Sequence, residues 1–247
     1  ALANIDSTSG LTNTGLGHTA LEDTTTGAQN TAVGTHAFRN NTSGNYNTGV
    51  GRGAGSNNTT GQFNTALGRF TLSANTTGQY NTAVGSDALA NNTASGNSGV
   101  GTFALYNNSS GASNSAVGYN AGFNNTTGEN NAALGRNALY GNTTAIRNVA
   151  IGAYSLDGAN TGNQNTACGY NSLGANTSGA ENTAIGSDAL QANTTGDRNT
   201  AVGRAALNFN TTGEYNLGVG YSALYANTTA NNNTGVGYYA LVAVVFP

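Results

Sequence analysis

The chain has 247 residues and a formal net charge of −3, and charged residues make up only 7% of it. That share is far below the roughly 25% of an ordinary globular domain. The seven basic residues are spread along the chain, which leaves no basic patch for nucleic acid. No apolar run reaches the roughly 18 residues of a membrane span, so membrane insertion is not expected. One cysteine, Cys168, excludes a disulfide framework.

A 17-residue unit, N-T-A-V-G-x-x-A-L-x-x-N-T-T-G-x-x, is repeated fourteen times. Twelve of the thirteen intervals between copies are 17 residues long, and the interval between Asn81 and Asn97 is 16. We number the positions of each copy from 1 to 17. Position 1 is always asparagine, position 5 is always glycine, and position 4 is always apolar. The copies begin at Asn13, Asn30, Asn47, Asn64, Asn81, Asn97, Asn114, Asn131, Asn148, Asn165, Asn182, Asn199, Asn216 and Asn233.

In chain order, residues 1–12 are expected to form a partial coil or cap, residues 13–241 the repeat domain, and residues 242–247 a terminal cap or subunit contact. Within each copy, N-T-A-V-G predicts a short strand and A-L a second one. The glycine of position 5 and the N-T-T-G run predict turns. No Asn-Gly dipeptide occurs, which disfavours hairpins. The sequence therefore predicts an all-β, parallel β-solenoid (a β-roll) of about fourteen coils of 17 residues.

Stacked coils give each position a role. The position-1 asparagines are expected to form a side-chain amide ladder, and the position-5 glycines a bend too tight for a Cβ atom. The position-4 and position-9 residues, mostly Val and Leu, are expected to form the core. Cys168 occupies position 4 and is therefore expected to be a small buried apolar residue rather than a reactive thiol. The 16-residue copy predicts a tightened turn near residues 94–96.

Such a thin core favours lateral partners. Burying the alanine columns between chains would cover more apolar surface, because small residues allow close approach. We therefore expect a homo-oligomer, with a trimer as the favoured state.

The runs N-T-A-V-G at 81–85 and N-V-A-I-G at 148–152 resemble the head repeats of trimeric autotransporter adhesins. The longer motif N-T-A-V-G-S-D-A-L-x-x-N-T-T-G resembles repeats of bacterial and phage fibre proteins. The resemblance covers residues 13–241, although the adhesin repeat is usually shorter. It implies an extracellular or cell-surface, trimeric, non-enzymatic fibre or head.

Residues that could bind a metal or a phosphate, or carry out catalysis, do not form a recognisable site in the sequence. The two histidines, His18 and His36, lack the further ligands that a metal needs. The run G-V-G-R-G-A-G at 49–55 follows the repeat register and opens no helix, so it is not read as a phosphate loop. No serine is paired with a base and a carboxylate in a recurring arrangement. We expect neither an enzyme nor a bound cofactor or metal. A solenoid enzyme of the pectate-lyase type would need a cleft of clustered acidic residues, and this sequence has none.

Position 6 varies and holds several large side chains. Aromatic and arginine side chains on a rigid scaffold suit adhesion to glycans or to neighbouring copies. The alternative is that they seal grooves between chains or cover the core. The candidate surface-binding residues are Tyr119, Arg136, Tyr170, Arg204 and Tyr221.

The N-T-T run has two further interpretations. It creates formal glycosylation sequons at Asn58, Asn75, Asn125, Asn142, Asn193, Asn210 and Asn227. Stacked threonines also resemble the ice-binding faces of other solenoids, so a soluble ice-binding protein is the alternative function. The neighbouring Asn and Gly favour a turn at this place over a flat face.

The last copy ends in V-A-V-V-F-P where N-T-T-G is expected. An apolar end could cover the core, join a further domain or bind another subunit. Head-to-tail contacts of this kind do not close and would build filaments. The candidate end-to-end contact residues are Val242, Val244, Val245 and Phe246.

Overall fold

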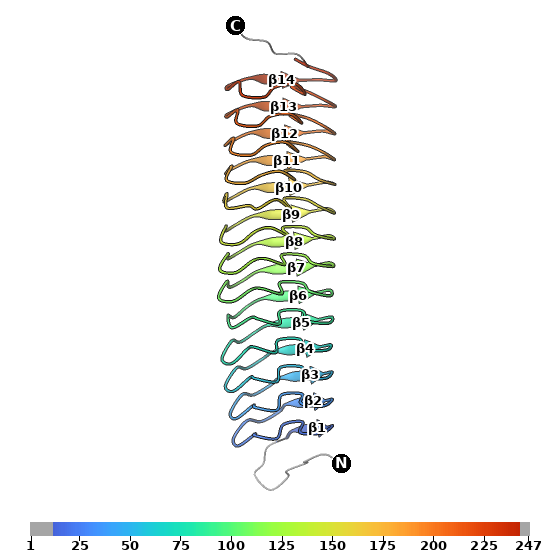
Figure 1. The fold of residues 1–247 in the computed structure, drawn as a ribbon, viewed down its shortest axis with the longest axis vertical. Helices are drawn as coiled ribbons and strands as arrows, with labels where there is room; N and C mark the ends of the chain where they lie inside the picture. Colours follow the sequence, from blue (N-terminus) through green and yellow to red (C-terminus); the bar gives the residue numbers. More distant parts are fainter. Residues whose placement is uncertain (1–11, 243–247) are drawn as a thin grey trace. The chain divides into compact units, whose positions relative to one another are not determined.

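The computed structural model describes residues 12–242 (Figure 1). They fall into two compact units, one up to Thr127 and the other from Gly128 on. Each unit contains seven strands of three residues, one per copy of the repeat. The strands of the first unit are β1 (Thr14–Leu16), β2 (Thr31–Val33), β3 (Thr48–Val50), β4 (Thr65–Leu67), β5 (Thr82–Val84), β6 (Ser98–Val100) and β7 (Ser115–Val117). Those of the second are β8 (Ala132–Leu134), β9 (Val149–Ile151), β10 (Thr166–Cys168), β11 (Thr183–Ile185), β12 (Thr200–Val202), β13 (Leu217–Val219) and β14 (Thr234–Val236).

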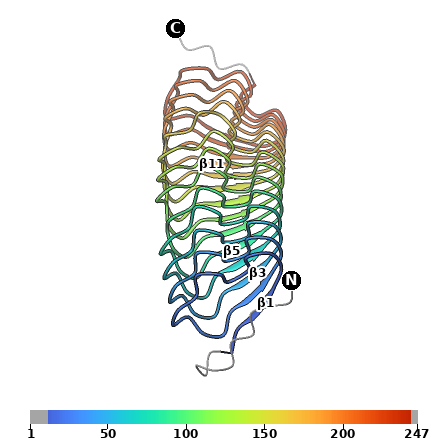
Figure 2. The same ribbon diagram turned by 60° about the horizontal axis from the view of Figure 1, so that its bottom comes forward.

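Within each unit, every strand pairs in parallel with the strands of the copies before and after it, and equal positions lie side by side. Thr31 pairs with Thr48, for example, and Val33 with Val50. Figure 2 shows the coils of each unit following one another with their strands on one side. The predicted parallel β-solenoid of about fourteen 17-residue coils is confirmed, since each copy makes one coil.

The interior of the coil is built from the opposite strand face to the one predicted. In every strand the middle residue, position 3, is buried, and the two outer residues are not; Ala32 and Ala184 have no exposed surface. Position 4 faces outward, so that Val50 is 42% exposed and Ile185 is also 42% exposed. The assignment of the position-4 column to the core was therefore wrong. Side chains alternate along a strand, and the narrow interior accepts only Ala or Gly beside the leucine of position 9.

The A-L run is not a second strand, contrary to the prediction. It consists of successive turns: the N–H of Ala37 donates to the carbonyl of Gly34, and the N–H of Arg39 to that of His36. Positions 7 and 9 take positive φ, for example 60° at His36 and 44° at Phe38, as the third residue of a type II turn does. These turns direct the position-9 side chain inward, where Leu89, Leu173 and Leu190 have no exposed surface.

The departures from leucine at position 9 compensate one another in the core. Phe38 is larger than leucine, and the next coil has glycine at the two positions that its ring reaches. A Cβ atom on Gly49 would lie 2.7 Å from the Phe38 ring, and one on Gly55 would be closer still. A Cβ atom on Gly122 would likewise meet Leu105 of the preceding coil at 2.9 Å. At Phe38, core volume is thus conserved between neighbouring coils rather than within one coil, whereas Gly122 lies between coils that both carry leucine at position 9.

The predicted tight bend at position 5 is confirmed. Gly34 has a φ of 130°, and a Cβ atom on it would lie 2.6 Å from the carbonyl oxygen of Gly51 in the next coil. The same approach recurs at Gly186, where a Cβ atom would lie 2.6 Å from the carbonyl oxygen of Gly203 in the next coil. Any larger residue at position 5 would hold two coils apart at this corner.

Candidate functional site

A ladder of position-1 asparagines runs through the coils, as predicted. The N–H of Asn47 donates to Oδ1 of Asn30 in the preceding coil at 2.9 Å. Its Nδ2 donates to the carbonyl of Gly61, at position 15 of its own coil, at 2.8 Å. Each side chain therefore joins neighbouring coils and also links the beginning of its own coil to its last turn.

A second asparagine ladder, which sequence reasoning missed, runs parallel to the first at position 12. Nδ2 of Asn58 donates to Oδ1 of Asn41 at 2.8 Å and to the carbonyl of Gly61 at 3.0 Å. Asn193 makes the equivalent bonds to Asn176 and Gly196. The regular recurrence of the asparagine in N-T-T-G was the signal that could have revealed it.

All seven noted sequons belong to this second ladder. Their asparagines are at most 2% exposed. The amide nitrogen that a glycan would have to occupy already donates inside the ladder, for example from Asn210 to Asn193 at 2.9 Å. The folded chain therefore offers no acceptor at these seven positions.

The 16-residue copy tightens the turn after Asn92, as predicted, and disturbs the second ladder. The residue removed lies between this asparagine and the following carbonyl: Nδ2 of Asn92 bonds the carbonyl two residues on, at Ala94, instead of three. Asn81 bonds the same carbonyl, so the first ladder continues unbroken to Asn97. Oδ1 of Asn75, however, is buried without a partner. The missing residue thus removes one rung from the second ladder.

The outward strand face presents two uncharged columns. Neither position 2 nor position 4 holds a charged residue in any copy. We call the position-4 column the aliphatic column; it comprises Leu16, Val33, Val50, Leu67, Val84, Val100 and Val117 in the first unit and Leu134, Ile151, Cys168, Ile185, Val202, Val219 and Val236 in the second. Cys168 is half-buried on this face rather than enclosed in the core, which corrects the prediction. The alanine columns at positions 3 and 8 are enclosed within the chain, so they are not available for contact between chains.

The candidate surface-binding residues of position 6 lie in three aromatic clusters. Tyr119 contacts the Phe103 ring edge-on at 6.3 Å between centroids. Arg136 lies 5.6 Å from the centre of the Tyr154 ring, which in turn contacts Tyr170. Because equal positions stack, cations and rings of neighbouring copies come together although they are about 17 residues apart.

The third cluster joins Arg204 and Tyr221. The Arg204 guanidinium lies 5.7 Å from the centre of the Tyr221 ring. Tyr221 stacks on Tyr238 at 5.3 Å and contacts Tyr239 edge-on at 5.3 Å. A hydrogen bond with the Tyr221 side chain raises the pKa of Tyr239 above its ordinary value. This cluster borders a cavity described below.

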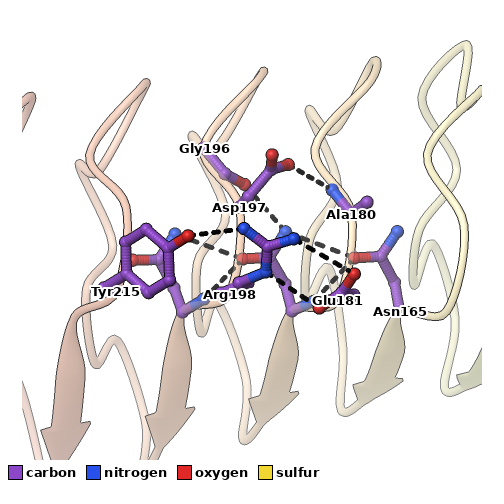
Figure 3. A network of polar contacts seen from close by, with 9 residues as sticks. Asn165, Ala180, Glu181, Gly196, Asp197, Arg198 and Tyr215 are labelled. Atoms are coloured by element: carbon purple, nitrogen blue, oxygen red, sulfur yellow. Dashed lines mark hydrogen bonds and ion pairs between the residues drawn. The ribbon is translucent and has the colours of Figure 1, made fainter.

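Position 17 carries a separate set of exposed contacts (Figure 3). Nε of Arg198 donates to Glu181 at 2.9 Å, and Nη1 donates to the Tyr215 hydroxyl at 2.5 Å. The hydrogen bond to Glu181 is the main cause of a raised pKa for Arg198. In the first unit the same position stacks three rings, with Tyr46 and Phe63 4.8 Å apart and Phe63 and Tyr80 5.1 Å apart. These contacts link coils at the surface, where isolated ion pairs contribute little to stability.

The two histidines lie in neighbouring coils, with ring centroids 5.8 Å apart. Nδ1 of His36 is hydrogen-bonded to the Thr19 hydroxyl. Among residues 12–242, no group of three or more His, Cys, Asp and Glu side chains is placed to hold a metal ion. Residues 49–55, the glycine-rich run, form the last two residues of strand β3 and the turns after it.

Of the candidate end-to-end residues, the structure describes Val242, whose carbonyl accepts a hydrogen bond from the N–H of Ala226. Val244, Val245 and Phe246 lie outside the described residues, as does most of the expected N-terminal cap.

Comparisons with family models, with curated proteins and with solved structures find no match to this chain. In the part of the chain that the structure describes, no helix has the length and apolarity to cross a membrane.

Proposed function

We propose that this chain is a non-enzymatic structural and adhesive fibre protein of the cell surface or extracellular space, which associates laterally with copies of itself. The observation that carries this proposal is the aliphatic column, which leaves large apolar side chains on a regular sheet face. Val50, Val117 and Ile185 are each 42% exposed. Contiguous exposed apolar surface of this kind marks interaction sites.

A second copy of the same chain is the partner that fits this face best. The face is uncharged and repeats with the spacing of the coils, about 4.8 Å. An identical face has the same spacing, so side chains of two copies can interdigitate along the column of each unit. A trimer is the favoured state because of the resemblance to trimeric adhesin heads.

Light scattering tests the lateral contact. We expect a trimeric mass for the full chain, and a monomeric mass for the double variant Val50→Glu, Ile185→Glu with an unchanged circular dichroism spectrum. The matched control is Thr195→Glu, at an exposed turn position away from the column, which should keep the trimeric mass. A monomeric wild-type chain, or a double variant that associates like the wild type, would refute the proposal.

Cys168 gives an independent readout because it lies in the aliphatic column. In the assembled protein its thiol should react slowly with a maleimide, and the rate should rise on dilution to monomers. A rate that does not change with protein concentration would contradict the assignment of this face as the contact.

End-to-end filaments are a further part of the proposal, based on the apolar sequence at 242–247. Electron microscopy of the full chain should show filaments, and deletion of residues 242–247 should leave short particles with the same β content. Short particles alone from the full chain would exclude the filaments.

Ice binding is the second candidate function, and one observation favours it. The position-2 threonines share the outward face with the aliphatic column, and within residues 12–242 the hydroxyls of Thr31, Thr65 and Thr183 bond to no protein group. The first threonine of the N-T-T run does not qualify, since the hydroxyl of Thr59 donates to the Thr76 carbonyl at 3.0 Å. Thermal hysteresis of the purified chain, abolished by Thr65→Lys, would support ice binding over the fibre.

A further inference from the structure

A cavity of about 330 Å³ opens on the surface of the second unit, over the coils of β11 to β14. Its walls come from positions 6, 7 and 10 of successive coils, so residues up to 51 places apart in the sequence meet there. Six side chains define it: Asp188, Arg204, Asn208, Tyr221, Tyr225 and Tyr239. The volume is at the lower end of the range of small-molecule sites, roughly 300–1,000 Å³.

Three tyrosines supply the apolar walls of this cavity, and other rings hold them in place. Tyr221 is fixed between Arg204 and the rings of the last described coil. Tyr225 packs edge-on against Phe209 at 4.9 Å. Rings that are already packed lose little conformational freedom when a ligand contacts their free faces.

The polar groups of the cavity are fixed as well. The Asp188 carboxylate accepts hydrogen bonds from Nδ2 of Asn171 at 3.1 Å and from the Ser187 hydroxyl at 2.9 Å. Asn208 is 8% exposed and is held by a 2.8 Å bond from its Nδ2 to the main-chain carbonyl of Asp188. Within residues 12–242 the Arg204 guanidinium forms no ion pair, so its N–H groups can serve a ligand.

We propose that this cavity binds a neutral pyranose sugar. A pyranose has an apolar C–H face, which suits the tyrosine rings, and a rim of hydroxyls that both donate and accept hydrogen bonds. Asp188 would accept from a vicinal pair of hydroxyls, and Arg204 would donate to them; such charge-assisted bonds are stronger than neutral ones. One carboxylate and one guanidinium balance each other, so the cavity does not select an anion. The inference rests on the proposed adhesive function and gives its ligand a chemical class.

The surroundings of Asp87 in the first unit differ from those of Asp188 in two respects. The sequence G-S-D-A-L occurs at residues 85–89 as well as at residues 186–190. There, Asp87 is paired with Arg69 at 3.5 Å, and position 7 of the next coil is Phe103 instead of Ala205. The Asp87 carboxylate is therefore already occupied by an ion pair, and the Phe103 ring lies where the second unit has the methyl group of Ala205. Asp87 therefore provides a matched control for Asp188.

The experiment is a binding assay of the full chain on immobilised mono- and disaccharides of glucose, galactose, mannose and N-acetylglucosamine, with sialyllactose as the acidic probe. We expect at least one neutral glycan to bind, and its affinity to fall about tenfold or more in Asp188→Asn and in Tyr221→Ala. Asp87→Asn and Tyr80→Ala, which removes an exposed ring at position 17, should bind like the wild type. Circular dichroism verifies that each variant is folded.

Three outcomes would overturn the proposal: no neutral glycan bound, equal binding by Asp188→Asn and the wild type, or binding of sialyllactose alone. Light scattering on the same samples separates this result from the lateral contact. Glycan binding by a monomeric chain would support the cavity and refute lateral assembly, whereas a trimer without glycan binding would do the reverse.

Discussion

The second asparagine ladder makes a quantitative prediction at Asn193. This side chain has no exposed surface, and it makes three hydrogen bonds: from its Nδ2 to Asn176 and to Gly196, and to its Oδ1 from Nδ2 of Asn210. Asn193→Ala removes all three. Oδ1 of Asn176 is then left buried without a partner, whereas the Gly196 carbonyl keeps its bond from Nδ2 of Asn182 and Nδ2 of Asn210 keeps its bond to Gly213. At about 1 kcal/mol for each hydrogen bond lost, the loss is about 3 kcal/mol.

The assay must be local, because coils of a repeat protein can open without unfolding the whole chain. Hydrogen–deuterium exchange with mass spectrometry on peptides covering residues 186–214 meets this need. A loss of about 3 kcal/mol corresponds to roughly a hundredfold faster exchange of the protected amides in this region. Peptides of the first unit should exchange as in the wild type.

Thr195→Ala is the matched control, since Thr195 is exposed in the same turn and its side chain bonds to no group in the described chain. Its effect should stay within about 0.5 kcal/mol. If Asn193→Ala exchanged no faster than Thr195→Ala, the ladder would not stabilise the stack, and the argument from buried partners would be refuted.

Four further predictions follow from the coil geometry. Gly186→Ala should prevent stacking at its corner and lower the melting temperature sharply. Gly96→Asn should melt like the wild type, because asparagine tolerates a φ of 74° and the added Cβ atom would make only an ordinary contact with Ser113, at 3.5 Å. Replacing Ala94 by Thr-Gly restores the 17-residue interval and should raise stability by about 1 kcal/mol in urea titrations, because Oδ1 of Asn75 regains a donor; an unchanged midpoint would contradict this. After secretion from a glycosylating host, mass spectrometry should find the seven ladder sequons unmodified in folded protein. The hydrogen bond that raises the pKa of Tyr239 stabilises the fold at pH values below about 10, the ordinary pKa of tyrosine. This stabilisation is lost as the pH rises through the raised pKa of Tyr239. In a spectroscopic pH titration, Tyr239→Phe should therefore remove the tyrosinate absorbance that appears at the highest pH.

The sequence determined the architecture because every copy of the repeat faces the same constraint. Asparagine at position 1 and glycine at position 5 can recur in fourteen copies only if equal positions stack, and this predicted parallel coils, the first ladder and the tight corner. The shortened copy also located its tightened turn, since a missing residue must be absorbed in the turn that follows Asn92.

The tertiary structure alone decided which face of each strand points inward. Hydrophobicity favours Val over Ala for a core, and so the sequence placed the position-4 column, with Cys168, inside. The width of the coil reverses this choice: the turns at positions 7 and 9 bring leucine into the interior, and only Ala or Gly fits opposite. The aliphatic column is therefore left on the surface. The cavity bounded by Asp188, Arg204 and Tyr221 was likewise beyond the sequence, because it depends on the exact stacking of three variable positions from four successive coils.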